Sequence, residues 1–228
     1  MPLQNRVDPA GAIHAVAARG MFTGNRGAID DPDSRTLLAR RFTTRAWLIC
    51  DCAYKGRKRE VFGRNTPGGG PGWTNLFFMD EVTALAAGHR PCFECRREKA
   101  LEFADCYSRA FRVARPRAAE IDARLHAERL ASGGRARPVA RDALMELPDG
   151  AVVAQGRRFL ARAKGRLLVW SFHGYEPLPG EPAGEGFVLT TPATTLRVLA
   201  AGYAPVWHPS ALDQPGVPAQ RLGDARQL

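Results

Sequence analysis

The stretch LAAGHRPCFECRR, residues 85–97, constrains the fold of this chain more than any other, because it stops one helix and starts another within a few residues. Asp80 is a suitable N-cap for a helix that runs through Ala87, and Gly88 fits the left-handed conformation that ends such a helix. Pro91 prevents the helix from continuing. The residues after Pro91 are therefore expected to form the junction between two helices.

A Cys-x-x-Cys pair, Cys92 and Cys95, occupies this junction, and the second helix is predicted to run from near Cys95 to about Phe111. The spacing lets both sulfurs bind one Zn²⁺ while the intervening backbone donates hydrogen bonds to the thiolates. The N-terminal end of a helix and neighbouring arginines favour thiolate, which would also suit a redox pair. The pair alone is weak evidence for structural zinc, because such a site needs two more ligands.

The chain has five cysteines, a number that does not suggest a disulfide framework at this length, so metal or redox chemistry is expected first. Cys50 and Cys52 are the candidates for the remaining ligands, on a strand predicted over residues 45–54. Residues two apart on a strand share a face but lie about 6–7 Å apart, so a bulge is needed for both to bind one ion. The alternative for this pair is a place in the core. Cys106, inside the second helix, is expected to pack.

The net charge of +10 suggests a polyanionic partner, with nucleic acid first. Residues 55–60 are expected to form an exposed hairpin turn, with residues 61–63 as the returning strand. Ordinary solvated side chains are the alternative reading of the basic residues at this turn and near the second helix. The candidate phosphate contacts are Lys55, Arg57, Lys58, Arg59, Arg90, Arg96 and Arg97.

Residues 75–104, NLFFMDEVTALAAGHRPCFECRREKALEFA, resemble the metal-binding domain at the N-terminus of Ada-type DNA alkylation-repair proteins. In that family an Asn-aliphatic-x-Phe segment precedes a helix, followed by Ala-Gly-aromatic-Arg-Pro-Cys-x-x-Cys and another helix. The matching residues are Asn75, Phe78, Ala87, Gly88, Arg90, Pro91, Cys92 and Cys95. With the preceding hairpin, the resemblance covers about residues 47–104. It implies a zinc module, built from a β-hairpin and two helices, that contacts a DNA backbone.

This sequence departs from the family at its first cysteine pair, which in the family is a Cys-x-x-x-Cys shortly after the hairpin. One of those two cysteines accepts the methyl group of a DNA phosphotriester. Here Gly63 stands where the first is expected and Pro67 stands near the second, so methyl transfer is not expected. Either Cys50 and Cys52 replace the lost ligands, or the zinc is lost and only the fold remains.

The whole chain is expected to be an α+β protein, and its 45% hydrophobic and 25% charged residues are ordinary for a globular one. A β or irregular extension at residues 1–45 precedes the Ada-like module at 46–112. A helical linker at 113–142 then leads to a small α+β domain at 143–212, expected to be an antiparallel sheet with a helix. Residues 213–228 are expected to form a disordered tail.

The favoured function is zinc binding together with nucleic-acid binding, without methyl-acceptor activity. A thiol redox or small hydrolytic enzyme on the same scaffold is one alternative, and a structural module that binds another protein is the other. An enzyme is the less expected outcome, because the five histidines are scattered without metal-ligand spacing and no catalytic residue stands out. Without an N-terminal signal sequence or a long apolar run, the chain is expected to be cytoplasmic and to have no membrane partner.

Overall fold

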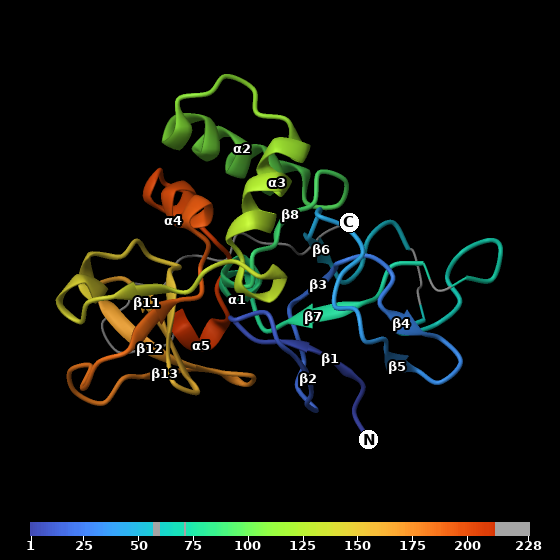
Figure 1. The fold of residues 1–228 in the computed structure, drawn as a ribbon, viewed down its shortest axis with the longest axis horizontal. Helices are drawn as coiled ribbons and strands as arrows, with labels where there is room; N and C mark the ends of the chain where they lie inside the picture. Colours follow the sequence, from blue (N-terminus) through green and yellow to red (C-terminus); the bar gives the residue numbers. More distant parts are fainter. Residues whose placement is uncertain (57–59, 71, 213–228) are drawn as a thin grey trace.

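The computed structural model describes residues 1–56, 60–70 and 72–212, and within them the protein is a mixed α+β structure, as the sequence predicts (Figure 1). Two six-stranded sheets account for most of the strands. A short helix, α1 (Glu81–Ala86), lies between them near the centre of the view. The tail predicted at residues 213–228 lies outside the described residues.

The first sheet, called the N-terminal sheet here, has the strand order β2-β1-β7-β3-β6-β8. Its strands are β1 (Gln4–Val7), β2 (Ile13–Ala15), β3 (Phe22–Asn25), β6 (Leu48–Asp51), β7 (Leu76–Phe78) and β8 (Arg90–Pro91). Two further strands, β4 (Asp30–Asp31) and β5 (Thr36–Leu37), form a separate pair. Strands β1, β2 and β3 show that the first residues of the chain belong to the same sheet as the strand that carries Cys50.

The hairpin predicted after the strand at residues 45–54 is wrong. Strand β6 forms within that predicted range, but it pairs with β3 on one edge and with β8 on the other. Both edges of its backbone are therefore occupied, and no edge remains for a returning strand. Val61 and Phe62, which were expected in that strand, lie in a turn instead.

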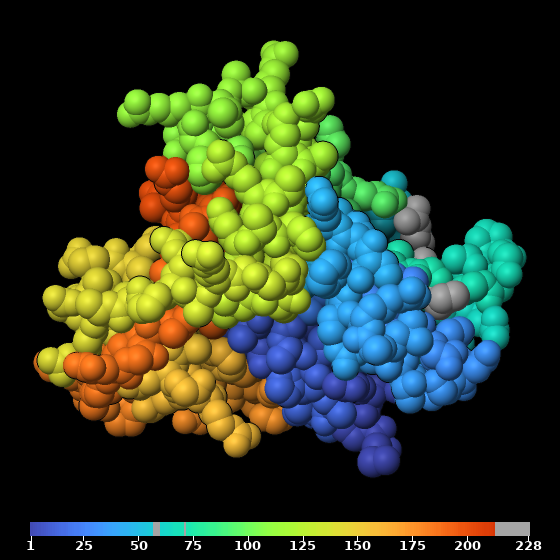
Figure 2. Space-filling model, in the orientation of Figure 1, coloured from blue at the N-terminus to red at the C-terminus, as the bar shows by residue number. Residues whose placement is uncertain are grey.

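The second sheet, called the C-terminal sheet here, is antiparallel throughout and has the order β13-β12-β11-β10-β14-β9. The antiparallel sheet predicted for this part of the chain is thus confirmed. Its strands are β9 (Arg137–Val139), β10 (Val152–Gln155), β11 (Arg158–Ala163), β12 (Arg166–Ser171), β13 (Gly174–Pro177) and β14 (Phe187–Leu189). In the space-filling view the N-terminal strands and this sheet occupy opposite sides of one face (Figure 2).

Helix α1 begins and ends with the predicted signals. The carboxylate of Asp80 accepts a hydrogen bond from the backbone N–H of Thr83 at 2.8 Å, and Gly88 has a φ of +81°. Every residue of α1 is buried, because one side packs into the core of the N-terminal sheet and the other into the core of the C-terminal sheet. The helix therefore fixes the position of the cysteine pair that follows it.

Three longer helices gather on one side of both sheets, at the top of Figure 1. They are α2 (Arg97–Phe111), α3 (Ala118–Glu128) and α4 (Ala193–Ala200). Phe103 of α2, Ile121 of α3 and Val198 of α4 share one core cluster with the N-terminal sheet. Cys106 is 2% exposed in this cluster, which confirms its predicted packing role.

The remaining helical elements are short: α5 (Pro209–Leu212) and two 3₁₀ helices, Leu130–Ser132 and Asp142–Glu146. None of the helices in the described ranges combines the length and the apolar character that crossing a membrane requires.

Candidate metal centre

One face of the N-terminal sheet carries the first cysteine of the site. Side chains alternate along a strand, so Ile49 points into the core and Cys50 points to the opposite face. Cys50 lies opposite Thr23 of β3, and Thr23 in turn lies opposite Phe77 of β7. The pairing of three short strands thus places Cys50 at a defined position on the face that the core does not use.

Strand β8 brings the second and third cysteines to Cys50. Pro91 pairs with Ile49, and the backbone N–H of Cys92 donates to the carbonyl of Ile49 at 3.0 Å. The chain then turns through Cys95 before α2 begins at Arg97, just after the pair and not within it. As a result the three sulfurs of Cys50, Cys92 and Cys95 all lie within 4.8 Å of one another.

Hydrogen bonds inside this cluster give its thiols different pKa values. The thiols of Cys50 and Cys95 donate to the sulfur of Cys92, and this lowers the pKa of Cys92. The hydrogen bonds that the Cys50 thiol donates to Cys92 and to Cys95, together with burial, raise the pKa of Cys50 far above its ordinary range. The backbone N–H of Glu94 also donates to the Cys92 sulfur, at 3.4 Å. One thiolate is therefore favoured, and three at this distance need a cation to offset their mutual repulsion.

The donor set fits a metal ion. Three sulfurs from separate positions converge, and at least one is already favoured as the thiolate that a soft or borderline metal binds. Among the described residues, no further His, Cys, Asp or Glu joins the three. Cys52, the fourth predicted ligand, lies outside the cluster, and its sulfur approaches the carbonyl of Met21 at 3.5 Å. The two strand cysteines are thus separated, and only Cys50 is in the group.

A cleft of about 790 Å³ lies in front of the three sulfurs. Cys50, Cys92 and Cys95 form part of its wall, next to Asp51 and Cys52. A metal ion held by the three sulfurs would therefore have one side turned to open space and not to packed protein.

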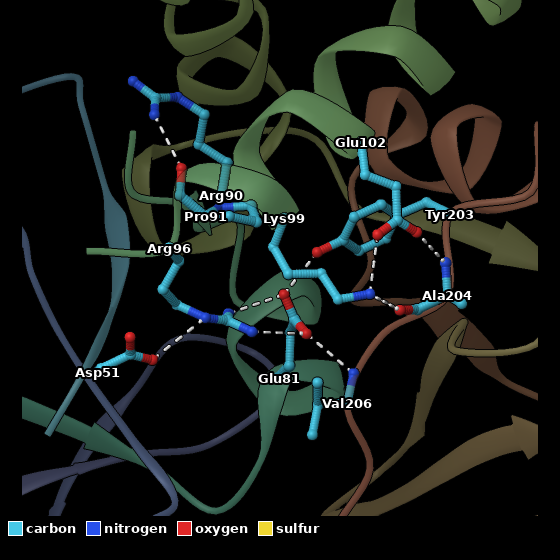
Figure 3. A network of polar contacts seen from close by, with 10 residues as sticks. All are labelled: Asp51, Glu81, Arg90, Pro91, Arg96, Lys99, Glu102, Tyr203, Ala204 and Val206. Atoms are coloured by element: carbon cyan, nitrogen blue, oxygen red, sulfur yellow. Dashed lines mark hydrogen bonds and ion pairs between the residues drawn. The ribbon is translucent and has the colours of Figure 1, made fainter. Parts of the chain in front are cut away.

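A buried ion-pair network holds the two cysteine-bearing segments together (Figure 3). Arg96, which follows Cys95, donates to both carboxylate oxygens of Glu81 at 2.8 and 3.1 Å. Its Nε also lies 3.5 Å from a carboxylate oxygen of Asp51, which follows Cys50. Glu81 is fully buried, and Tyr203 also donates to it at 2.6 Å. The network thus joins β6, α1 and the residue before α2.

Two of the predicted nucleic-acid contacts are buried in ion pairs. Arg90 donates to both carboxylate oxygens of Asp122 at 2.8 and 2.7 Å and is 5% exposed. Arg96 is 7% exposed and pairs with Glu81, as described above. Neither guanidinium is available to a phosphate group, so the expectation for these two residues is not supported.

Of the other five predicted phosphate contacts, two are exposed and three lie outside the described residues. Lys55 and Arg97 are exposed, in the chain after Tyr54 and at the start of α2. The three remaining basic residues of the predicted hairpin tip, Arg57, Lys58 and Arg59, lie outside the described residues. Of the seven predicted phosphate contacts, the described structure therefore offers Lys55 and Arg97 on the surface.

Sequence reasoning missed the contribution of the first residues of the chain. Thr23 and Asn25 of β3 line the cleft beside the cysteines, although residues 1–45 were expected to be an extension. The alternation of Phe22 and Gly24 with Thr23 and Asn25 is typical of a strand with two different faces. Such a short alternation indicates a strand but does not indicate its partner.

Asp122 and Glu81 were also missed as partners of the buried arginines. They lie 32 and 15 residues from Arg90 and Arg96 in the chain, and no local pattern connects such distant charges. No family model matches the sequence, and no curated protein and no solved structure matches it either.

Proposed function

We propose that the chain is a zinc-binding protein in which Cys50, Cys92 and Cys95 hold one Zn²⁺, and that this module contacts nucleic acid without accepting a methyl group. The observation that carries the zinc proposal is the convergence of three sulfurs within 4.8 Å. Two of them, Cys92 and Cys95, come from the Cys-x-x-Cys turn. The third, Cys50, comes from a strand and lies 42 residues before Cys92 in the chain.

Zinc is favoured over other ions by the chemistry of the donors. Thiolates suit zinc, and zinc sites with sulfur ligands are tetrahedral with metal–sulfur distances of about 2.3 Å. When bound by three protein ligands, zinc keeps a fourth position for water or another ligand. All three cysteines line the cleft, so in this proposal the fourth position opens into it. Cys92 in addition accepts a hydrogen bond from the backbone of Glu94, as expected of a zinc-binding turn.

A thiol redox function is the weaker alternative. Redox chemistry of a Cys-x-x-Cys pair needs two sulfurs, whereas the sulfur of Cys50 also lies within 4.8 Å of both members of the pair. Three converging protein ligands with one position left open is an arrangement that zinc accepts.

The nucleic-acid part of the proposal now depends on fewer residues. Its support is the net charge of +10, the exposed Lys55 and Arg97, which follow the two cysteine-bearing segments in the chain, and the resemblance to Ada-type domains. The proposed absence of methyl transfer rests on Gly63, which stands where the family's first cysteine is expected, and on Pro67, which stands near the second. In this proposal Cys50 supplies the third sulfur in their place.

Zinc content per chain tests the metal proposal. The full-length protein, purified under reducing conditions, should contain one zinc per chain. Separate substitutions Cys50→Ser, Cys92→Ser and Cys95→Ser should each lower that content at least severalfold. Cys52→Ser and Cys106→Ser are the matched controls and should keep it, because neither sulfur lies in the cluster. A parent protein without zinc, or equal loss in the controls, would contradict the proposal.

Salt dependence tests the nucleic-acid proposal. Affinity for nucleic acid should fall steeply as salt rises, because phosphate contacts release bound counterions. Lys55→Gln and Arg97→Gln should each make this dependence shallower. Arg158→Gln, an exposed residue on β11 of the other sheet, is the control and should leave it unchanged. Binding that is undetectable at low salt would remove this part of the proposal.

A further inference from the structure

The cleft beside the cysteines has a floor made by one face of the N-terminal sheet. Strands β3 and β7 pair antiparallel with Thr23 opposite Phe77 and Gly24 opposite Leu76. The same register, continued by one residue, places Asn75 opposite Asn25. One row of the floor therefore reads Phe77, Thr23 and Cys50, and the next row holds the two amide side chains.

Asn75 has a polar atom that the fold does not use. The residue is 7% exposed, it lines the cleft, and its amide oxygen is buried without a hydrogen-bond partner in the described structure. Its neighbour Asn25 accepts one long hydrogen bond, from the backbone of Gly27 at 3.4 Å. Buried acceptors are nearly always paired in proteins. No described hydrogen bond fixes the orientation of the Asn75 amide, so a half-turn about its Cβ–Cγ bond presents the unpartnered oxygen to the cleft, where a ligand can donate to it.

Aromatic rings form other parts of the same cleft. Phe77 lies on the floor, and Tyr54 and Trp73 come from the chain before and after residues 60–70. The hydroxyl of Tyr54 donates to the carbonyl of Glu94 at 3.1 Å, which holds this part of the chain against the Cys-x-x-Cys turn. Flat rings next to amide side chains are the two elements that proteins use to stack and read a single base.

The charge of the wall selects for a neutral part of a ligand. Among the described residues that line the cleft, none is lysine or arginine, whereas Asp51 and Glu94 are acidic. Arg6 lies beside this wall, but its guanidinium contacts the Phe77 ring at 4.8 Å and donates to Ala18 and Asn5. The acidic residues of the wall therefore favour a group with amino donors over a phosphate group. The volume of about 790 Å³ is within the range of small-molecule sites, roughly 300–1,000 Å³.

We propose that this cleft binds a single nucleobase that carries an amino group, with Asn75 accepting from that amino group and Phe77 packing against the ring. The base is presented by a nucleotide or by a single strand of nucleic acid, and its phosphates lie outside the cleft. The single-strand form rests on the nucleic-acid proposal above, whereas the free-nucleotide form does not.

Cytidine and uridine are a matched pair of uncharged probes, because they differ chiefly in an amino or keto group at one position. Calorimetric titration of the full-length, zinc-loaded protein should give roughly tenfold tighter binding of cytidine, as expected for one discriminating base contact. Asn75→Leu should abolish this preference. Phe77→Leu should weaken both probes about equally, because stacking does not distinguish bases strongly.

Thr195→Val is the matched control. Thr195 is also fully buried and its hydroxyl also lacks a partner, but it lies in α4, away from the cleft. Neither it nor Asn75→Leu should lower the melting temperature, because each removes a buried polar atom that no described residue satisfies. Of these two variants, only Asn75→Leu should change nucleoside binding. No measurable cytidine binding by the parent, or an unchanged preference in Asn75→Leu, would overturn the inference.

The source of the base is decided by comparing cytidine monophosphate with a single-stranded oligonucleotide of deoxycytidine. Tighter binding of the oligonucleotide, still weakened by Asn75→Leu, assigns the cleft to single-stranded nucleic acid. Equal binding assigns it to a free nucleotide. Cytidine binding without any oligonucleotide binding supports the cleft and contradicts the nucleic-acid proposal. Oligonucleotide binding that Asn75→Leu and Phe77→Leu both leave unchanged supports the nucleic-acid proposal and contradicts the cleft.

Discussion

Arg96 and Glu81 form a two-point ion pair, at 2.8 and 3.1 Å, in which the carboxylate is fully buried. Arg96 directly follows Cys95, and Glu81 begins the helix that precedes the cysteine pair. The ion pair thus holds the two ends of the segment 81–96 together, and it keeps the cysteine turn in position against β6.

Glu81→Gln should destabilise the protein strongly, because it leaves the guanidinium of Arg96 buried with only part of its charge offset. Breaking a buried ion pair in this way costs about 3–5 kcal/mol. Urea unfolding of the zinc-free protein measures it. Glu120→Gln, in the exposed ion pair of Glu120 with Arg117, is the control and should leave the midpoint unchanged. Equal effects of the two variants would contradict the structural role of Glu81.

Gly88→Ala should cost more than its backbone conformation alone explains. Gly88 and Gly165 share a φ of +81°, but a Cβ on Gly88 would lie 2.7 Å from the Cβ of Arg129, whereas a Cβ on Gly165 meets nothing within 4 Å. Gly165→Ala is therefore expected to cost about 1–2 kcal/mol, from the left-handed conformation. Gly88→Ala should exceed that value in a paired urea experiment. Matching values would show that Arg129 moves aside without cost.

The stability of the protein should fall as the pH drops below about 6.5, in part because of His89. Burial, followed by the charges of Arg26 and Arg129, holds the pKa of His89 well below its ordinary value. The unfolded chain therefore takes up a proton near pH 6.5 that the folded chain does not. Each unit of pH below that point should remove about 1.4 kcal/mol of unfolding free energy. At higher pH this contribution is fully present.

His89→Phe tests this assignment, because the ring still packs near Trp47 and Phe78 but cannot take up a proton. Unfolding free energies at pH 7.5 and pH 5.5 should differ less in His89→Phe than in the parent. His173→Gln, a surface change, is the control for removing a histidine. A parent-like pH dependence in His89→Phe would mean that other groups cause it.

Removal of zinc should lower the melting temperature of the parent. A ligand that binds only the folded state adds about 2.7 kcal/mol at a free concentration one hundred times its dissociation constant. Scanning calorimetry with zinc and with a chelator measures the shift. Cys50→Ser should lose most of the shift, and Cys106→Ser should keep it. A shift that survives in Cys50→Ser would place the zinc elsewhere.

The features that depend on neighbouring residues could be predicted from the sequence. The Asp80 cap and the Gly88 termination are local signals, and both are present as expected. The candidate ligands Cys92 and Cys95 followed from their spacing. Cys50 was a candidate together with Cys52, as the other close cysteine pair, and the structure brings only Cys50 to Cys92 and Cys95.

The features that depend on strand pairing and distant charges could not be predicted. Strand β6 pairs with β3 and β8, and its own four residues do not specify either partner. Arg90 and Arg96 looked like surface cations because their acidic partners are remote in the chain. The cleft could not be predicted either, because its floor combines residues 23–25 with residues 75–77, which are remote in the chain.

Zinc K-edge X-ray absorption of the zinc-loaded protein tests the central claim most directly, because it counts the sulfur ligands. We expect three sulfurs at about 2.3 Å and one lighter atom in the fourth position. Cys52→Ser should give the same spectrum. Four sulfur ligands in the parent, reduced to three in Cys52→Ser, would contradict a three-cysteine centre that opens into the cleft.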